Sequence, residues 1–174
     1  MNRKKRRANL KHYHQNETGG YDYDGAHWRW QDDQLRKPFL RAGYLRICLA
    51  VGLMILAGCL PAPGAGYAVY ILLPYAAGIL AGVLSLMAFV RLGMEKERLR
   101  DYVYDSSVMK LPGRLTVSLA GAAVAGAAQL LHIVIYRPDA GMIWAAAYAA
   151  CEFLAAGLLL VQKKKGDLLS WTKE

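Results

Sequence analysis

Four long apolar runs, separated by short polar segments, constrain this chain more than any other feature of its sequence. Each run approaches the length of about 20 residues that an α-helix needs to cross about 30 Å of hydrocarbon. The sequence therefore predicts an all-α integral membrane protein, an antiparallel bundle of four transmembrane helices. The predicted spans are Tyr44 to Leu60, Tyr67 to Val90, Leu115 to Tyr136 and Gly141 to Gln162.

The basic residues lie almost entirely on one side of these spans. Of the 22 Lys and Arg residues, only Arg137 falls in a segment that the alternation of four spans places on the opposite side. An excess of Lys and Arg in short loops marks the cytoplasmic side of a membrane protein. We therefore expect a multi-pass protein of the cytoplasmic membrane with both termini in the cytoplasm. Its parts are a basic tail over residues 1–43, a transmembrane domain over 44–162 and a second basic tail over 163–174.

The net charge of +9 fits this topology better than it fits nucleic-acid binding, because the basic residues are placed as the orientation rule requires. The expected partner is the lipid bilayer, with the first basic tail touching anionic headgroups at about 1 kcal/mol per residue. We expect no nucleic-acid partner. We also expect no metal or cofactor, because neither the histidines nor the three cysteines form a cluster with ligand spacing.

The links between the spans predict how the helices are arranged. The links at 61–66 and 137–140 are short, so the first two spans and the last two spans should each be antiparallel neighbours. The longer segment 91–114 mixes charges at helical spacing, which favours one or two solvated helical turns at the membrane surface. We expect Pro112 to break the chain before the third span.

One segment of the N-terminal tail has the pattern of a β-hairpin. Asp24 and Gly25, a favourable pair for a tight turn, lie between two runs of alternating residues. An isolated two-stranded hairpin is only marginally stable in water, so its aromatic face should contact lipid headgroups or a partner protein. The alternative is a tail without stable structure. The aromatic residues of this face are Tyr21, Tyr23, Trp28 and Trp30.

Glu152 is the one acidic residue inside the predicted spans, near the middle of the fourth. Placing an ionisable group in hydrocarbon costs about 2.5 to 3.5 kcal/mol, so the residue needs a reason to be there. Gln129 and His132 of the third span, with Tyr148 of the fourth, are expected to converge with it. Two interpretations stay open: a site that exchanges a proton or pairs with a cationic substrate, or a protonated Glu152 that only joins two helices by a hydrogen bond.

Small residues form stripes on the second, third and fourth spans. Such stripes let helix backbones approach closely. On the second span, Gly78 and Gly82 form a GxxxG motif, which packs either on another subunit or on helices of the same chain. The residues expected to pack helices together are Gly78, Gly82, Gly121, Ala125, Gly126 and Ala149.

No motif in the sequence names a reaction, and the chain is too short to add a soluble catalytic domain to four spans. We therefore expect a protein that is not an enzyme. The sequence favours an accessory or interaction subunit that binds another membrane protein or a second copy of itself. The alternative is a small, oligomeric, proton-coupled transporter that uses Glu152.

Overall fold

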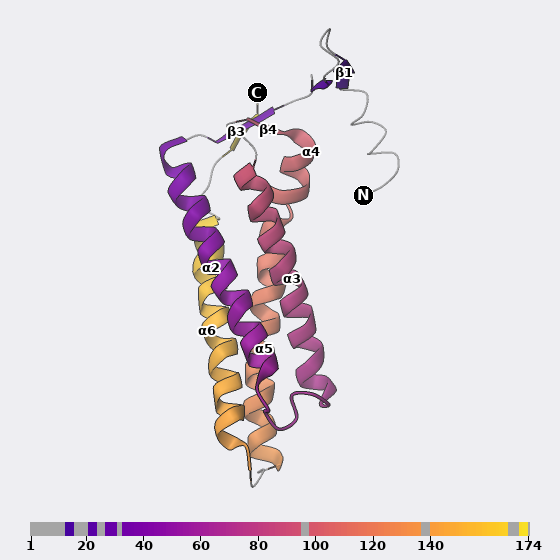
Figure 1. The fold of residues 1–174 in the computed structure, drawn as a ribbon, viewed down its shortest axis with the longest axis vertical. Helices are drawn as coiled ribbons and strands as arrows, with labels where there is room; N and C mark the ends of the chain where they lie inside the picture. Colours follow the sequence, from indigo (N-terminus) through magenta and orange to yellow (C-terminus); the bar gives the residue numbers. More distant parts are fainter. Residues whose placement is uncertain are drawn as a thin grey trace.

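Four long helices make up most of the protein (Figure 1). The computed structural model describes residues 13–15, 21–23, 27–30, 33–94, 98–136, 140–166 and 171–173. All four helices are long and apolar enough to cross a membrane, which supports the predicted multi-pass membrane protein. They are α2 (Asp33–Cys59), α3 (Val69–Met94), α5 (Leu111–Tyr136) and α6 (Met142–Gly166).

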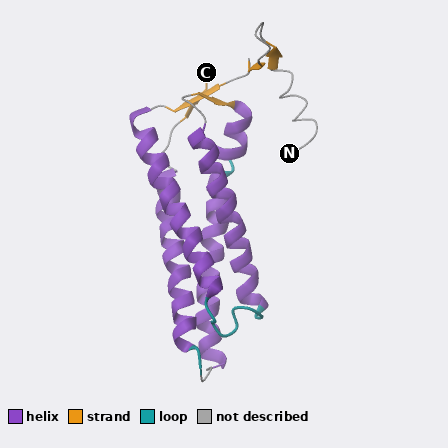
Figure 2. Ribbon diagram, in the orientation of Figure 1, coloured by secondary structure: helices purple, strands orange, loops and turns teal. Residues whose placement is uncertain are grey.

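The helices form an antiparallel bundle in which each packs against two neighbours. Helix α2 packs on α3 and α6, and α5 packs on the same two helices. This confirms that the first two spans are neighbours and that the last two are neighbours. Helix α2 begins and α6 ends at one end of the bundle, here called the terminal end (Figure 2). At the opposite loop end, residues 60–68 join α2 to α3 and a short link joins α5 to α6.

Two of the helices begin earlier than the sequence predicts. Helix α2 starts at Asp33 rather than at Tyr44, and its first turns pack inward, with the ring of Phe39 centred 6.1 Å from that of Phe89. Helix α5 starts at Leu111 rather than at Leu115, with Pro112 as its second residue, and the break expected at Pro112 lies just before it, at the turn of Met109 and Lys110. Proline is tolerated in the first turn, where the backbone N–H has no partner within the helix.

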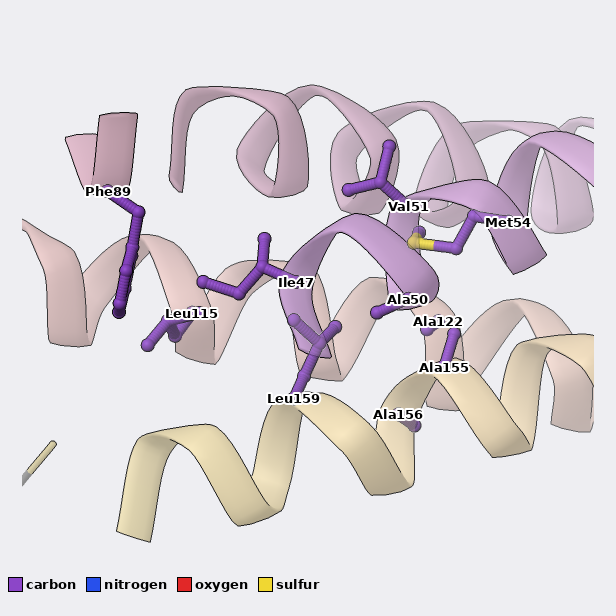
Figure 3. Close-up of a cluster of buried hydrophobic side chains, with 10 residues drawn as sticks. All are labelled: Ile47, Ala50, Val51, Met54, Phe89, Leu115, Ala122, Ala155, Ala156 and Leu159. Atoms are coloured by element: carbon purple, nitrogen blue, oxygen red, sulfur yellow. The ribbon is translucent and has the colours of Figure 1, made fainter. Parts of the chain in front are cut away.

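Apolar side chains fill the bundle and also cover its outside. Figure 3 shows the larger interior cluster, to which all four helices contribute. Outward-facing leucines such as Leu45 and Leu73 are 58% and 64% exposed. Exposed apolar surface of this extent on a helical bundle is what lipid contact requires. The buried members of the cluster in Figure 3 are Ile47, Ala50, Val51, Met54, Phe89, Leu115, Ala122, Ala155, Ala156 and Leu159.

Helices α3 and α5 make the closest backbone contact in the described bundle. A Cβ atom built on Gly121 would lie 2.6 Å from the Cα atom of Gly78 and 2.6 Å from the carbonyl oxygen of Pro74. The hydroxyl of Ser118 donates a hydrogen bond of 2.9 Å to the Gly78 carbonyl at the same crossing. The GxxxG motif of Gly78 and Gly82 therefore packs on a helix of the same chain.

Short strands lie at the terminal end. Strand β1 (Tyr13–Gln15) pairs with β2 (Tyr21–Tyr23), while β3 (His27–Trp30) is the central strand of a sheet with β4 (Arg98–Arg100) and β5 (Trp171–Lys173). The strands expected at 21–23 and 27–30 are thus present, but their predicted pairing with each other is wrong. The turn at Asp24 and Gly25 lies outside the described residues. The sheet of β4, β3 and β5 is called the cap below.

The cap replaces the helical turn that the sequence predicts around 98–100. In the structure this stretch is strand β4, and it continues into a short α-helix, α4 (Asp101–Val103), and a π-helical turn at Tyr104–Val108. The physical reason is that strands β3 and β5 offer β4 a sheet to join, which stabilises it more than isolated solvated turns are stabilised.

Aromatic packing ties the cap to the bundle. The Trp28 ring stacks on Tyr104 with centroids 3.9 Å apart, and Trp28 Nε1 donates a hydrogen bond of 2.8 Å to Asp101 Oδ1. The Trp30 side chain is 4% exposed and lies against Phe39 and Trp171. Trp28 and Trp30 therefore pack within this chain rather than forming a free contact surface. The side chains of Tyr21 and Tyr23 lie outside the described part.

The α3–α5 contact predicts that Gly121→Ala destabilises the bundle. The added methyl group meets backbone atoms that cannot move aside, and overpacking of this kind costs about 1–3 kcal/mol. The matched control is Gly157→Ala on α6, where a Cβ meets nothing within 4 Å. Thermal unfolding of both variants in detergent, followed by size-exclusion chromatography, should show a lowered midpoint for Gly121→Ala alone. Equal midpoints would contradict the contact.

The cap predicts that Trp30→Ala exposes strand β4 to protease. Removing this ring leaves Phe39 and Trp171 without their shared neighbour, so the sheet should open more often. Limited trypsin digestion should then cleave at Arg98 or Arg100 several times faster than in the unchanged protein. Trp144→Ala is the control, because Trp144 is 46% exposed on α6 near the loop end. Faster cleavage in both variants would point to general unfolding instead.

Candidate functional site

Glu152 lies on α6 with its side chain in the interior of the bundle. The residue is 0% exposed, and neither of its carboxyl oxygens has a hydrogen-bond partner among the described residues. Ten residues separate it from the first residue of α6, a rise of about 15 Å from the loop end. Because buried polar groups in proteins are almost always hydrogen-bonded, two orphaned oxygens on one carboxyl group mark an unusual position.

The helix opposite Glu152 leaves space for it by carrying a glycine. A Cβ atom on Gly126 of α5 would lie 3.3 Å from the Cβ atom of Glu152 and 3.3 Å from the ring of Phe153. Any larger residue at Gly126 would press on the base of the Glu152 side chain. The close approach of α5 and α6 at this level is what buries the carboxyl group.

Two tyrosines stand on the side of Glu152 toward the loop end. Tyr148 precedes Glu152 by one helical turn on the same face of α6, and its side chain is 1% exposed. Its ring centroid lies 6.2 Å from that of Tyr75 on α3. The Tyr75 hydroxyl donates a hydrogen bond of 3.2 Å to the backbone carbonyl of Met54, so its proton is directed to α2. Gly58 makes this possible, since a Cβ there would lie 2.0 Å from the Tyr75 oxygen.

Gln129 holds the loop end to α5. Its Nε2 atom donates a hydrogen bond of 2.9 Å to the carbonyl oxygen of Pro63, in the link between α2 and α3. The carbonyl can only accept, so the amide nitrogen faces the loop and Oε1 faces elsewhere. Gln129 Oε1 is buried and has no hydrogen-bond partner among the described residues. Gln129 lies one turn from Gly126, about 4.5 Å along α5, and so close to the level of Tyr148.

His132 belongs to a separate cluster nearer the loop end. Its side chain is 4% exposed, and Nδ1 is hydrogen-bonded to the hydroxyl of Tyr70. The ring packs over Gly64, which has a φ of 84° and no room for a Cβ beneath the imidazole. His132 lies about 9 Å along α5 from Gly126, two turns from the level of Glu152. By helical rise, Gln129 and Tyr148 thus lie about one turn from the level of Glu152, whereas His132 lies about two turns away, toward the loop end.

A second buried amide lies toward the terminal end of α6. Gln162 is 0% exposed, and its Oε1 atom accepts a hydrogen bond of 3.0 Å from the guanidinium group of Arg46 on α2. Its Nε2 atom is buried without a partner among the described residues and lies near Gly43. This pair joins α2 to α6 some distance from Glu152, since Gln162 is ten positions after Glu152, about 15 Å along α6.

The orphaned atoms of Glu152 and Gln129 are all hydrogen-bond acceptors. They are the two carboxyl oxygens of Glu152 and Oε1 of Gln129. Groups of this kind attract a proton, an N–H donor or a cation, and they repel an anion. The described residues contain no group of three His, Cys, Asp or Glu side chains placed to hold a metal ion. The chemistry available is therefore exchange of a proton or binding of a cationic group.

No family model, curated protein or solved structure matches this chain.

Sequence patterns identified Glu152, Gln129, His132 and Tyr148 but not the residues that complete their surroundings. A single sequence does not distinguish Tyr75, Gly58 or the Pro63 carbonyl. Tyrosine and glycine are common in membrane helices, and every residue has a backbone carbonyl group. The nearest signal was the GxxxG motif of Gly78 and Gly82 on the same helix, because it orients α3 and so places Tyr75 toward the interior.

The Gln129 bond predicts a specific effect of Gln129→Leu. Leucine is close in size but leaves the Pro63 carbonyl without its donor, at a cost of about 0.5–2 kcal/mol. Hydrogen–deuterium exchange of residues 61–68 should accelerate. Gln162→Leu is the matched control, because it removes a buried amide at the other end of the bundle. Unchanged exchange in the loop for Gln129→Leu would show that this hydrogen bond does not hold the link.

Proposed function

We propose that this protein is a small proton-coupled transporter of the cytoplasmic membrane, in which Glu152 alternately holds a proton and a cationic solute. The observation that supports it is the Glu152 carboxyl group, fully buried among the helices with both oxygens unpartnered. The terminal end, with its cap and basic tails, faces the cytoplasm in this proposal because Lys and Arg concentrate there.

The physical argument starts from the cost of the charge. A carboxylate without partners in a dry interior is unstable, so the empty site favours the protonated, neutral form. A cationic solute that reaches the site offsets that cost by pairing with the carboxylate, and the proton leaves. Proton and solute therefore compete for one carboxyl group, which is the thermodynamic requirement for coupled exchange.

A purely structural role for Glu152 is the simplest competitor. A protonated carboxyl group that donates to one neighbouring oxygen would join two helices, as buried polar groups in membrane proteins often do. In that role the protonated carboxyl group supplies one O–H donor. The other orphaned oxygens of Glu152 and Gln129 would not all gain a hydrogen-bond partner from it. It also does not require an ionisable residue, because Gln at position 152 could donate the same kind of hydrogen bond.

The experiment is Glu152→Gln in reconstituted liposomes. Vesicles that contain purified protein and a trapped pH indicator are exposed to a panel of primary, tertiary and quaternary organic cations. The proposal expects cation-driven proton movement in the unchanged protein and its loss in Glu152→Gln, because glutamine keeps the shape but cannot release a proton.

Leu154→Ala serves as the control for this test, because Leu154 lies two residues from Glu152 on α6 and is 61% exposed. It should retain the proton movement. Equal proton movement in Glu152→Gln and the unchanged protein would overturn the proposal, and so would no response of the unchanged protein to any member of the panel.

A second candidate function is the accessory subunit of a membrane complex. The observation that favours it is the cap, in which the outer strands β4 and β5 each pair with β3 alone among the described strands. Strand edges of this kind can accept an extended segment of another protein. Trp28 and Trp30 no longer support this candidate, because they pack within the chain. Absence of any Glu152-dependent proton movement would favour it.

A further inference from the structure

We infer that the solute bound at Glu152 is a primary ammonium on a small apolar body, held by both Glu152 oxygens and Gln129 Oε1. The inference rests on the proposed function, since it names the substrate class of the same carboxyl group. It depends on the number and type of the unmatched polar atoms, on the aromatic rings beside them and on the apolar walls around them.

The unmatched atoms suit three N–H donors. Glu152 supplies two orphaned oxygens and Gln129 supplies one, and all three are buried. The hydrogen bond from Gln129 Nε2 to the Pro63 carbonyl fixes the amide orientation, so Oε1 is available only as an acceptor. A proton on Glu152 supplies one donor for these oxygens, whereas a primary ammonium supplies three. The ammonium also carries the charge that stabilises the carboxylate.

The positions of these residues allow one ligand to reach them. Gly126 lies against the base of Glu152, and Gln129 is one turn farther along the same face of α5. Tyr148 lies one turn from Glu152 in the same direction on α6, because α5 and α6 are antiparallel. By helical rise, Glu152, Gln129 and Tyr148 therefore lie within about one turn of one another along the bundle.

The remaining walls fit an apolar body and a cation. Tyr75 and Tyr148 present two rings with centroids 6.2 Å apart at an interplanar angle of 44°, and aromatic faces attract cations. Tyr148 belongs to a cluster of apolar and mostly small side chains, against which Tyr75 also packs. The buried members of this cluster are Ala57, Ala62, Ala68, Ile71, Ala145 and Tyr148.

A bare metal cation fits these atoms less well. Calcium takes six to eight oxygen ligands, and magnesium keeps a near-octahedral shell. The described part of the chain offers three orphaned oxygens here and no cluster of acidic or histidine ligands. A quaternary ammonium would satisfy the charge but none of the acceptors, because it has no N–H groups. These differences make the ligand class testable.

The test measures binding of 2-phenylethylammonium to purified protein by isothermal titration calorimetry in two buffers of different ionisation enthalpy. We expect saturable binding with release of close to one proton per ligand, because the Glu152 carboxyl group loses its proton when the ammonium pairs with it. The trimethylated analogue of the same cation should bind about tenfold more weakly or worse, since it cannot donate to the three oxygens. The neutral analogue 2-phenylethanol should not bind measurably.

Two variants test which side-chain atoms bind the ammonium group. Glu152→Gln should abolish binding and proton release together. Gln129→Leu should weaken the primary ammonium several-fold more than it weakens the trimethylated analogue, because only the primary ammonium uses Oε1, whereas loosening of residues 61–68 acts on both cations. Thermal unfolding of both variants establishes that they are folded. The preference between the two cations is measured in the unchanged protein, so the inference stays testable even if a variant does not fold.

The outcomes separate this inference from the proposed function. No saturable binding of the primary ammonium, or equal affinity for the trimethylated cation, would overturn the inference. If quaternary cations alone then drove Glu152-dependent proton movement, the proposed transport function would stand, but the primary ammonium would be rejected as the substrate class. Conversely, Glu152-dependent binding without proton movement across liposomes would keep the site and reject transport.

Discussion

The rest of the structure depends on the backbone contact between α3 and α5 at Gly78 and Gly121. No Cβ atom fits at Gly121, and the Ser118 hydroxyl bonds the Gly78 carbonyl at the same crossing. Helices in lipid gain little from the hydrophobic effect, so close packing of small residues and interhelical hydrogen bonds hold them together. This contact fixes the rotation of α3 and α5, and thereby directs Tyr75 and Gln129 into the bundle instead of toward lipid.

The same close packing explains why the Glu152 carboxyl group has no hydrogen-bond partner among the described residues. Gly126 lets α5 approach α6 closely, but it has no side chain that could form a hydrogen bond with the carboxyl group. The nearest hydroxyl on α3, that of Tyr75, is bonded to the Met54 carbonyl. A bundle selected only for stability would place an apolar residue at 152, because an unmatched polar group costs more than an apolar one. The retained carboxyl group is therefore the strongest indication of a function within the membrane.

The sequence predicted the four spans and the inward direction of Glu152, Gln129 and Tyr148, because helical periodicity and apolar length are local properties. It did not predict the cap. Strand β3 pairs with β4 about 70 residues later and with β5 more than 140 residues later, and such pairing leaves no local pattern. The Asp24-Gly25 turn signal suggested a local partner for β3, while the aromatic packing of Trp30 on Trp171 favours the distant one.

Access to Glu152 differs between the two ends of the bundle. About 15 Å of α6 separates it from the loop end and about 21 Å from the last residue of α6. At the terminal end, contacts among several aromatic rings and two strand pairings stabilise the cap. At the loop end, the hydrogen bond from Gln129 to Pro63 and the packing of His132 on Gly64 close the shorter path. In the proposed function, an ammonium that takes Gln129 Oε1 therefore binds the same side chain that holds the loop. In that case Oε1 accepts from the ligand while Nε2 donates to the Pro63 carbonyl, so one amide group contacts both the ligand and the link between α2 and α3.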